Sequence, residues 1–429
     1  MGEIQALRGT RDILPEEVGY WQWVEAAARV LLANAAYQEI RTPTFEATAL
    51  FERGIGEATD VVGKEMYTFL DRGDRSVTLR PEGTAGVVRA LVEHGMYTQG
   101  GVQRLWYTGP MFRYERPGAG RQRQFHQLGV EVIGSAAPRA DVEVIAIATD
   151  ILQNLGLKSL QLYINSVGNV ADRQGYRAAL VEYLTPYQQE LDLDSQDRLI
   201  RNPLRILDSK DERTQEIVKN APSILDYLGS DSQHHFQQVQ QLLNDLGITY
   251  QLNPRLVRGL DYYTNTAFEI QSADLGTQAT VCGGGRYDGL VAQLGGPDTP
   301  AVGWAIGLER LIILLQQLQS PPIVGLDFYL VSRGEVAEAQ ALRLAQKLRQ
   351  AGFSAELDLS GSGFKKQFTR ADRSGAVACL ILGDEEAANQ TVQIKWMMSK
   401  EQQAIAQADL LLMTDDLRRQ IDMKKSEAS

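Results

Sequence analysis

The chain has 429 residues, of which 44% are hydrophobic and 23% charged, and its formal net charge at pH 7 is −11. These values are typical of a soluble globular protein, and the length favours two or three domains, because a single core rarely serves so long a chain. No run of about 18 or more apolar residues and no signal-peptide pattern is present, so we expect a cytoplasmic protein without a membrane partner. The acidic total argues against nonspecific binding to nucleic acid, but it allows docking on a local basic surface.

Cysteine and histidine are too sparse for a zinc site. The two cysteines, Cys282 and Cys379, lie far apart in the chain, and no CxxC pair is present. The four histidines form no HExxH motif. We therefore expect neither a disulfide framework nor a metal held by the protein's own side chains.

The first hundred residues predict helices and strands in alternation. Apolar spacing predicts a helix over 17–37, and a strand that contains a proline is expected over 39–46. Two β-rich runs around DRGDR predict a hairpin within 66–80. A helix is expected over 81–95, with an acidic residue at its positive end.

A strand, a loop and a second strand are expected over 104–134. A helix over 139–156 and a strand over 160–166 follow. Residues 168–250 are polar, rich in glutamine and helix-patterned, without a convincing strand. This change of character indicates a helical insertion.

Strands are expected again over 256–272 and 278–284, and a helix over 302–318. Pro321 and Pro322 then break the chain. Beyond them β and α patterns alternate, which indicates a separate domain with a small parallel or mixed sheet. The strands and helices expected there are, in chain order, 326–332, 334–351, 354–360, 364–374, 376–383 and 391–397.

Alternation along the expected strand 125–133 puts Gln127, Gly129 and Glu131 on one face and apolar side chains on the other. An amide and a carboxylate with a bare glycine between them make a polar floor for a small ligand. The alternative is that Gln127 and Glu131 face solvent on a one-sided sheet, and both interpretations are open.

The segment FRYERPGAGRQRQFHQ concentrates positive charge. Four arginines are opposed by one glutamate, a local charge of 4 − 1 = +3: Arg113, Arg116, Arg121, Arg123 and Glu115. Guanidinium groups match the geometry of phosphate oxygens, and a bound triphosphate needs several of them. A solvated cluster of charges is the alternative.

Two further arginines lie elsewhere in the chain. Arg258 falls within the expected strand 256–272 beside paired tyrosines, and Arg310, which alone has the pattern of an ordinary surface residue, lies on the expected helix 302–318. The glycines of VCGGGRYDGL allow a ligand to approach the backbone closely. Neither a P-loop nor a GxGxxG motif is present, so a bound nucleotide would lie on an antiparallel sheet and be held by arginines.

Six ordered motifs, and a seventh segment after them, carry a resemblance to a known family. They are RGTRDILP (8–15), TLRPEGTAG (78–86), FRYERPGAGRQRQFHQ (112–127), RGLDYYTNTAFE (258–269), GGGRYDGL (283–290), GLERL (307–311) and GFKKQFTRADRSGA (363–376). Over nearly all of its length the chain resembles the histidyl-tRNA synthetases, which are class II aminoacyl-tRNA synthetases. The third motif resembles class II motif 2, the sixth resembles motif 3, and the last segment is similar to the anticodon-binding domain.

The resemblance implies an α+β fold. We expect a catalytic domain on an antiparallel sheet of about six or seven strands, interrupted by a helical insertion, and a C-terminal α/β anticodon-binding domain. The catalytic domain would span 1–167 and 253–320, the insertion 168–252 and the anticodon domain 325–429. The first helix and the strand after it would form motif 1, the interface of a homodimer.

The resemblance also implies a reaction, in which ATP activates L-histidine to histidyl-adenylate and the histidyl group passes to the 3′ end of tRNA(His). Positioning and charge stabilisation should dominate, because the protein contributes little covalent chemistry. Arg113 would hold the α-phosphate and the substrate carboxylate, Arg310 would hold the γ-phosphate, and Glu115 would also contact ATP. Arg258 would be a fixed cation at the α-phosphate. Mg²⁺ would accompany the β- and γ-phosphates.

The side chains that the resemblance implies for histidine binding are Glu82, Thr84, Gln127, Glu131, Tyr262, Tyr263 and Tyr287. Glu82 would bind the α-amino group, with the threonine and the glutamine assisting. Glu131 and Tyr263 would bind the two imidazole nitrogens from opposite sides, and the other two tyrosines would complete the wall.

Two basic surfaces would contact tRNA. Arg116, Arg121 and Arg123 would lie in the motif 2 loop, which approaches the acceptor end. The anticodon would dock on a second basic segment formed by Lys365, Lys366 and Arg370.

The regulatory subunit of ATP phosphoribosyltransferase, a non-catalytic relative that senses histidine, is the alternative. Such a relative typically lacks the anticodon domain and loses the arginines, whereas this sequence has both. One position departs from the family, which usually has Gly where this chain has Asn265. Asn is the residue best able to replace Gly at positive φ, so we expect only a small local change.

Overall fold

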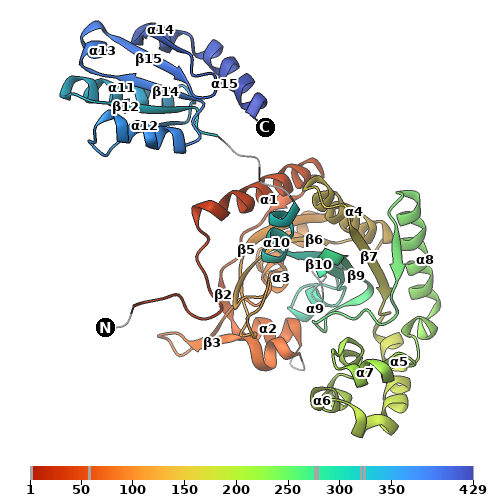
Figure 1. The fold of residues 1–429 in the computed structure, drawn as a ribbon. Helices are drawn as coiled ribbons and strands as arrows, with labels where there is room; N and C mark the ends of the chain where they lie inside the picture. Colours follow the sequence, from red (N-terminus) through yellow and green to blue (C-terminus); the bar gives the residue numbers. More distant parts are fainter. Residues whose placement is uncertain (1–2, 57–58, 275–279, 319–320, 322–324, 429) are drawn as a thin grey trace. The chain divides into compact units, whose positions relative to one another are not determined.

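The computed structural model describes residues 3–56, 59–274, 280–318, 321 and 325–428, and the chain divides into two units, Met1–Pro321 and Pro322–Ser429 (Figure 1). Each unit has its own sheet and its own buried apolar core. Among the described residues, no helix is long and apolar enough to cross a membrane.

The first unit is built on an eight-stranded sheet with the strand order β1-β5-β6-β11-β10-β9-β7-β8. The strands are β1 (Gln38–Glu39), β5 (Gln103–Phe112), β6 (Gln124–Ile133), β7 (Leu160–Ser166), β8 (Tyr250–Leu252), β9 (Thr264–Ser272), β10 (Thr280–Arg286) and β11 (Ala301–Gly307). The strands between β1 and β8 pair antiparallel, whereas β1 and β8 pair parallel to β5 and β7. The expected antiparallel sheet is confirmed, and two short parallel strands extend its edges.

Helices cover one face of this sheet. They are α1 (Pro15–Asn34), α4 (Pro138–Asn154), α8 (Ser230–Asp245) and α10 (Leu308–Leu318) (Figure 1). In α1 the buried residues Trp21, Val24, Ala28 and Leu32 recur at spacings of three and four, so one apolar stripe packs against the sheet. The polar side chains of the middle strands point to the opposite face.

Smaller elements lie on that opposite face. A three-stranded antiparallel sheet contains β2 (Phe45–Ala47), β4 (Ser76–Leu79) and β3 (Tyr67–Leu70), in that order. The helices there are α2 (Thr48–Ile55), α3 (Thr84–Glu93) and α9 (Leu290–Gln293). The predicted hairpin within 66–80 is confirmed as β3 and β4, and the helix predicted over 81–95 is confirmed from Thr84.

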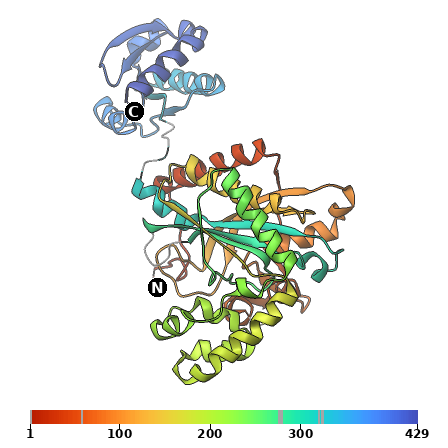
Figure 2. The same cartoon turned by 90° about the vertical axis from the view of Figure 1, so that its right-hand side faces the viewer.

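The helical pattern predicted for 168–250 is also confirmed. The helices are α5 (Val170–Leu184), α6 (Leu193–Arg201), α7 (Glu212–Val218) and α8. Asn169 caps α5 in a reciprocal capping box with Asp172. Tyr176, Leu180 and Ile206 belong to a buried core that this segment shares with Val257 and with Ala267 of β9. Helices α5, α6 and α7, coloured yellow-green, gather below the large sheet in both views (Figure 1 and Figure 2).

The second unit is an α/β domain with the strand order β13-β12-β14-β15-β16. Its strands are β12 (Phe328–Ser332), β13 (Ala355–Leu357), β14 (Ala378–Leu382), β15 (Thr391–Trp396) and β16 (Gln402–Ala406). Its helices are α11 (Glu335–Gln350), α12 (Phe364–Arg373), α13 (Asp384–Asn389), α14 (Gln407–Leu412) and α15 (Thr414–Ala428). The pairs β13-β12 and β12-β14 are parallel and the others antiparallel, so of the two expected forms, a parallel or a mixed sheet, the sheet is mixed.

Two predictions for the first unit are wrong. The strand predicted over 256–272 begins only at Thr264, so Arg258 lies in an irregular segment before β9. The helix predicted over 302–318 is a strand, β11, as far as Gly307, and only the remainder is helical. A short apolar run such as AVGWAIG fits a buried central strand as well as a helix, and periodicity alone cannot separate the two.

Two further strand predictions are adjusted. The strand predicted over 39–46 is two short strands, β1 and β2, which belong to different sheets. The strand predicted over 278–284 begins outside the described residues, and from Thr280 it is confirmed as β10.

Candidate active site

A cavity of about 680 Å³ lies over the middle strands of the large sheet. The predicted site residues that line it are Glu82, Thr84, Arg113, Glu115, Arg121, Gln127, Arg258, Tyr262, Tyr263, Tyr287 and Arg310. Glu131 lies beneath the lining, within hydrogen-bond distance of two of these side chains. The fold therefore gathers residues from distant motifs around one space.

Glu131, on β6, is a buried carboxyl group with only 1% of its surface exposed. The Thr84 hydroxyl donates to its Oε1 at 2.7 Å, and the Tyr287 hydroxyl donates to its Oε2 at 2.5 Å. Burial outweighs these hydrogen bonds and raises the pKa of Glu131 to about 8. The interpretation of a solvent-facing strand is therefore excluded for this residue, and its carboxyl group is mainly protonated at neutral pH.

Glu82 lies at the N-terminus of α3. Its two carboxylate oxygens accept hydrogen bonds from the backbone N–H groups of Thr84 and Ala85, at 2.6 and 2.8 Å. These N–H groups have no partner within the helix, and the positive end of a helix favours a carboxylate. Burial nevertheless raises the pKa of Glu82. A second poorly solvated carboxyl group thus shares one end of the cavity with Glu131.

Tyrosine rings form a wall at the same end. The ring centroid of Tyr262 is 4.7 Å from that of Tyr263 and 5.6 Å from that of Tyr287. The amide oxygen of Gln127 is buried and has no hydrogen-bond partner among the described residues. A buried acceptor of this kind costs free energy unless a ligand or water supplies a donor. A ligand with an N–H group in the cavity would supply such a donor.

Tyr107, on β5, lines the cavity and was missed by the sequence analysis. A Cβ added to Gly83 or to Gly129 would lie 2.2 Å from its ring, so both glycines make room for this tyrosine. Its buried hydroxyl has no hydrogen-bond partner among the described residues. The signal is the pairing of Tyr107 with Gly129 across β5 and β6, which only the strand register reveals.

Arg258 is a fixed cation that lines the cavity, with its guanidinium 5.8 Å from the centroid of the Tyr263 ring. Its guanidinium forms an ion pair with Glu269 of β9, and a Cβ on Gly283 would lie 2.2 Å from its Nη2. Thr280 and Gln271 donate to the second oxygen of Glu269, at 2.8 and 2.9 Å. Although burial disfavours the charge, Glu269 raises the pKa of Arg258. Arg258 is therefore charged and held in place by its neighbours.

Arg113 and Arg121 flank Glu115. The Arg113 Nε donates to the carbonyl of Pro81 at 2.8 Å, and its guanidinium lies 5.3 Å from the centroid of the Phe125 ring. Arg121 pairs with Glu115 at 2.9 Å, whereas the closest approach of Arg113 to that carboxylate is 3.8 Å. Both arginines keep N–H groups that a ligand can use.

Arg310, on α10, also lines the cavity. Its Nη1 donates to the carbonyl of Thr280 at 2.9 Å. Burial and the nearby Arg121 lower the pKa of Arg310. A group of negative charges would relieve this repulsion between guanidinium groups.

Two of the clustered arginines do not line the cavity. Arg116 is exposed. The guanidinium of Arg123 lies 3.7 Å from the centroid of the Tyr114 ring. The sequence segment thus divides into arginines that face the cavity and arginines that do not.

The basic residues predicted for the anticodon lie in the second unit. Lys365 and Lys366 are exposed on α12. Arg370 pairs instead with the buried carboxylate of Asp358, at 2.7 Å. Its guanidinium is thus engaged within the domain itself.

The helical segment also contributes to the cavity, which the sequence analysis did not foresee. Its lining residues are Asp192, Asp194, Arg198, Arg205, Asp208, Ser209, Lys210 and Asp211. Arg205 donates to the backbone carbonyl of Arg258 at 3.0 Å. No motif marks these residues, because they lie in polar helices and turns. Within the described residues, no three His, Cys, Asp or Glu side chains gather as a metal site requires, and the predicted lack of zinc stays a prediction.

An antiparallel sheet that carries arginines over its middle strands, in a chain that also has an α/β domain, defines a class II aminoacyl-tRNA synthetase. A family profile described as "Histidyl-tRNA synthetase" matches residues 9–311, and one described as "Anticodon binding domain" matches residues 327–413. The chain belongs to the histidyl-tRNA synthetase family.

Similar proteins agree with this membership. The histidine–tRNA ligase of Gloeothece citriformis is 74% identical over 98% of either chain. That of Picosynechococcus sp. is 72% identical over 99% of this chain and 100% of its own. The crystal structure of apo S. aureus histidyl-tRNA synthetase is 41% identical, with a TM-score of 0.81, and the match covers 96% of this chain and 100% of that one.

Proposed function

We propose that the cavity activates L-histidine with ATP and that the histidyl group then passes to tRNA(His). The protein is a histidine–tRNA ligase by its family and by 74% and 72% identity to two such ligases over nearly its whole length. One observation carries the assignment of the site: two poorly solvated carboxyl groups, Glu82 and Glu131, and a group of arginines surround the same cavity. We call the part around the carboxyl groups the histidine end and the part around the arginines the ATP end. The first end suits the ammonium and imidazole of histidine, and the second suits a triphosphate.

At the histidine end, we assign the α-amino group to Glu82, with Thr84 and Gln127 as further acceptors. The unpartnered amide oxygen of Gln127 supports this assignment. Glu131 and Tyr263 would bind the two imidazole nitrogens, and Tyr262 and Tyr287 would enclose the ring. A site built from such hydrogen bonds rejects an amino acid that lacks the matching groups by a factor of roughly 10⁴ to 10⁵.

At the ATP end, the carboxylate of histidine would attack the α-phosphorus while pyrophosphate leaves. Negative charge at the α-phosphate would be stabilised by Arg113 and Arg258, and the γ-phosphate would be held by Arg310. The ion pair between Arg258 and Glu269 supports this role, because a cation already fixed in place needs little reorganisation as charge develops.

Mg²⁺ would accompany ATP. The carboxylates of Glu65 and Glu115 line the cavity near the arginines, and burial together with Glu115 raises the pKa of Glu65. Two neighbouring carboxylates fit a divalent cation that is bound mainly by phosphates, and the ion would neutralise part of the phosphate charge.

Further parts of the proposal concern partners. Arg116, Arg121 and Arg123 would meet the acceptor end of tRNA, and Lys365, Lys366 and Arg370 the anticodon. The helical part 168–252 would act as a separate insertion in the catalytic domain. A homodimer is supported by exposed apolar side chains such as Val30 on α1 and Phe45 on β2. Ligation of tRNA for translation would place the enzyme in the cytoplasm.

The decisive experiment is exchange of labelled pyrophosphate into ATP without tRNA, with each of the other amino acids as a control. Exchange that depends on L-histidine alone is expected. Absence of exchange from a protein that still binds histidine in calorimetry would contradict the proposal. It would favour a histidine-sensing role like that of the ATP phosphoribosyltransferase regulatory subunit.

A further inference from the structure

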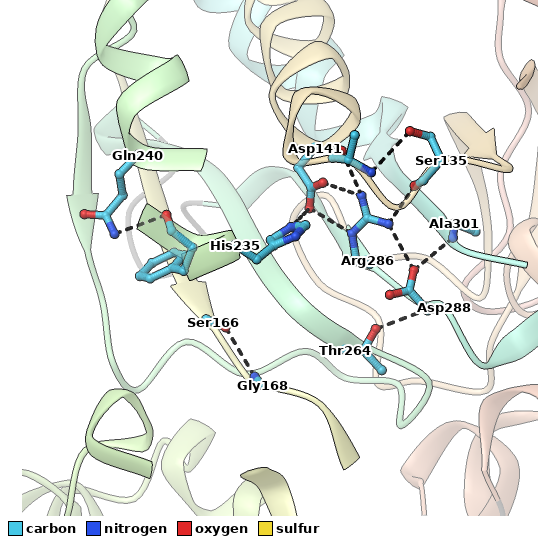
Figure 3. A network of polar contacts seen from close by, with 12 residues as sticks. Ser135, Asp141, Ser166, Gly168, His235, Gln240, Thr264, Arg286, Asp288 and Ala301 are labelled. Carbon is cyan, nitrogen blue, oxygen red and sulfur yellow. Dashed lines mark hydrogen bonds and ion pairs between the residues drawn. The ribbon is translucent and has the colours of Figure 1, made fainter. Parts of the chain in front are cut away.

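A buried ion network joins β10, α4 and α8 on the side of the large sheet that the helices cover (Figure 3). Arg286, the last residue of β10, is 1% exposed, and Asp141, on α4, is 0% exposed. Figure 3 shows the Asp141 carboxylate between the guanidinium of Arg286 and the ring of His235, which belongs to α8. The residue after Arg286, Tyr287, lines the cavity. The side chains of these two neighbours therefore point to opposite faces of the sheet.

The guanidinium of Arg286 uses its full set of donors. Nε and Nη2 donate to the two oxygens of Asp141, Nε at 3.2 Å. Nη1 donates to the carbonyl of Ser135 at 2.8 Å and to Asp288 Oδ1 at 3.0 Å, and Nη2 also donates to the carbonyl of Ala137 at 3.4 Å. An arginine has five N–H donors in a rigid fork, and lysine cannot reproduce that arrangement.

The pair is ionised in spite of its burial. Burial opposes both charges, but Asp141 raises the pKa of Arg286, and His235 and Arg286 lower the pKa of Asp141. His235 Nε2 lies 3.4 Å from Asp141 Oδ1, so the network extends to the last helix of the segment that supplies part of the cavity lining.

The same network fastens the backbone around Tyr287. Asp288 Oδ1, which accepts from Arg286, also accepts from the backbone N–H of Ala301 at 3.0 Å. The backbone N–H of Tyr287 donates to the carbonyl of Ala301 at 2.7 Å. The hydroxyl of Tyr287 then donates to Glu131. The position of this hydroxyl therefore depends on how Arg286 is held.

We propose that Arg286 is a positioning residue for histidine recognition, which holds Tyr287 against Glu131. We call Arg286 together with Asp141 and Asp288 the clamp, and we propose that His235 connects α8 to it. The inference rests on the proposed histidine site. Neither Arg286 nor Asp141 lines the cavity, so their effect would pass through Tyr287. A buried ion pair contributes little net stability compared with apolar side chains of similar volume, and its place directly behind Tyr287 therefore favours a role in specificity.

The test uses Arg286→Lys in the full-length enzyme, which keeps the charge and removes the fork. Histidine-dependent pyrophosphate exchange gives kcat and the KM values for histidine and ATP, and a thermal melt reports stability. We expect the KM for histidine to rise about tenfold, while that for ATP changes by less than about twofold. Equal rises in both KM values, or a lower melting temperature with unchanged KM values, would show a merely structural role. Exchange by the wild-type enzyme tests the proposed function separately.

A double-mutant cycle with Tyr287→Phe sharpens the test. If Arg286 acts through the Tyr287 hydroxyl, Arg286→Lys should raise the KM for histidine by less than about twofold in the Tyr287→Phe background. Additive effects would overturn the proposal. Arg104→Lys is the matched control, because Arg104 also pairs through two nitrogens with an acidic residue of α4, Glu143, at 2.8 and 3.2 Å. It should leave both KM values unchanged.

His235→Gln keeps the proposal testable if Arg286→Lys does not fold. His235 lies at the edge of the network, with 16% of its side chain exposed, and its replacement leaves the ion pair in place. We expect a rise of about twofold to threefold in the KM for histidine and none in the KM for ATP. An unchanged KM for histidine would contradict the link to α8. If Arg286→Lys does not fold, the same result would also contradict the positioning role of Arg286.

Discussion

Replacing Glu131 with glutamine should stabilise the ligand-free enzyme at high pH and sharply weaken histidine binding. Glutamine copies the shape of a protonated carboxyl group and stays neutral at every pH. The ordinary pKa of the glutamate side chain is 4.5, and burial raises the pKa of Glu131 to about 8. Wild type and variant should therefore differ in how the free energy of unfolding depends on pH.

The direction of this pH dependence follows from the pKa values of the Glu131 carboxyl group in the unfolded and the folded chain. Below pH 4.5 the carboxyl group is protonated in both the folded and the unfolded chain, and the wild type loses no stability. As the pH rises toward 8, the unfolded chain loses its proton first, so the unfolded state is favoured. Each pH unit is worth about 1.4 kcal/mol, so the wild type loses about 4 kcal/mol between about pH 5 and pH 8.

Thermal melts of the wild type and the variant at about pH 5 and pH 8 measure this loss of stability. The variant should gain several degrees relative to the wild type at the higher pH, since a domain of this size shifts by about 2 °C for each kcal/mol. The KM for histidine should rise about tenfold to a hundredfold, because a hydrogen bond to a charged group is lost. Glu143→Gln is the control: Glu143 is 34% exposed, and this variant should show no such gain. A difference between wild type and Glu131→Gln that is the same at both pH values would refute the reasoning.

Three further predictions concern single residues. Arg258→Ala should lower the rate of pyrophosphate exchange about 10³-fold, because a fixed cation at the α-phosphate is lost, while calorimetry still detects histidine binding; near-normal exchange would refute its role. Histidine should bind most tightly between about pH 6.5, the ordinary pKa of imidazole, and about pH 8, the pKa of Glu131, because the two groups share one proton in the complex. Calorimetry in buffers of different ionisation enthalpy should then detect proton release on binding below this pH range and proton uptake above it. If the number of protons exchanged on binding were the same at every pH, imidazole and Glu131 would not share a proton. Asn265→Gly should change the KM for histidine by less than about twofold and the free energy of unfolding by less than about 0.5 kcal/mol, since Asn265 has a φ of 47° and does not line the cavity. A much lower KM would show that this side chain obstructs the substrate.

The polar floor of the site was predictable because alternation along a strand is a local property. Gln127, Gly129 and Glu131 share a face of β6 for this reason alone, and Leu128 and Val130 pack on the helices as expected. The burial of Glu131 was not predictable in the same way, because it depends on what covers that face.

The conformation around Arg258 shows why the rest could not be predicted. Paired tyrosines favour a strand, yet the segment before β9 is irregular. Arg205 donates to the carbonyl of Arg258, and Arg173 donates to the carbonyls of Asp261 and Tyr263 at 3.4 and 2.7 Å. Arginines of the helical segment thus satisfy backbone acceptors that strand pairing would otherwise use. Such partners are distant in sequence and carry no local signal.

When no substrate is bound, the cavity disfavours negative charge on the carboxyl groups of the histidine end and positive charge on an arginine of the ATP end. Burial raises the pKa values of Glu82 and Glu131 at one end, while burial and Arg121 lower the pKa of Arg310 at the other. The ammonium and imidazole of histidine would relieve the first end, and the phosphates of ATP the second. Each substrate should therefore stabilise the enzyme by itself. An amino acid without a second basic nitrogen would leave the buried Glu131 carboxyl group without a basic partner, so the same desolvation that weakens the ligand-free protein would provide the discrimination.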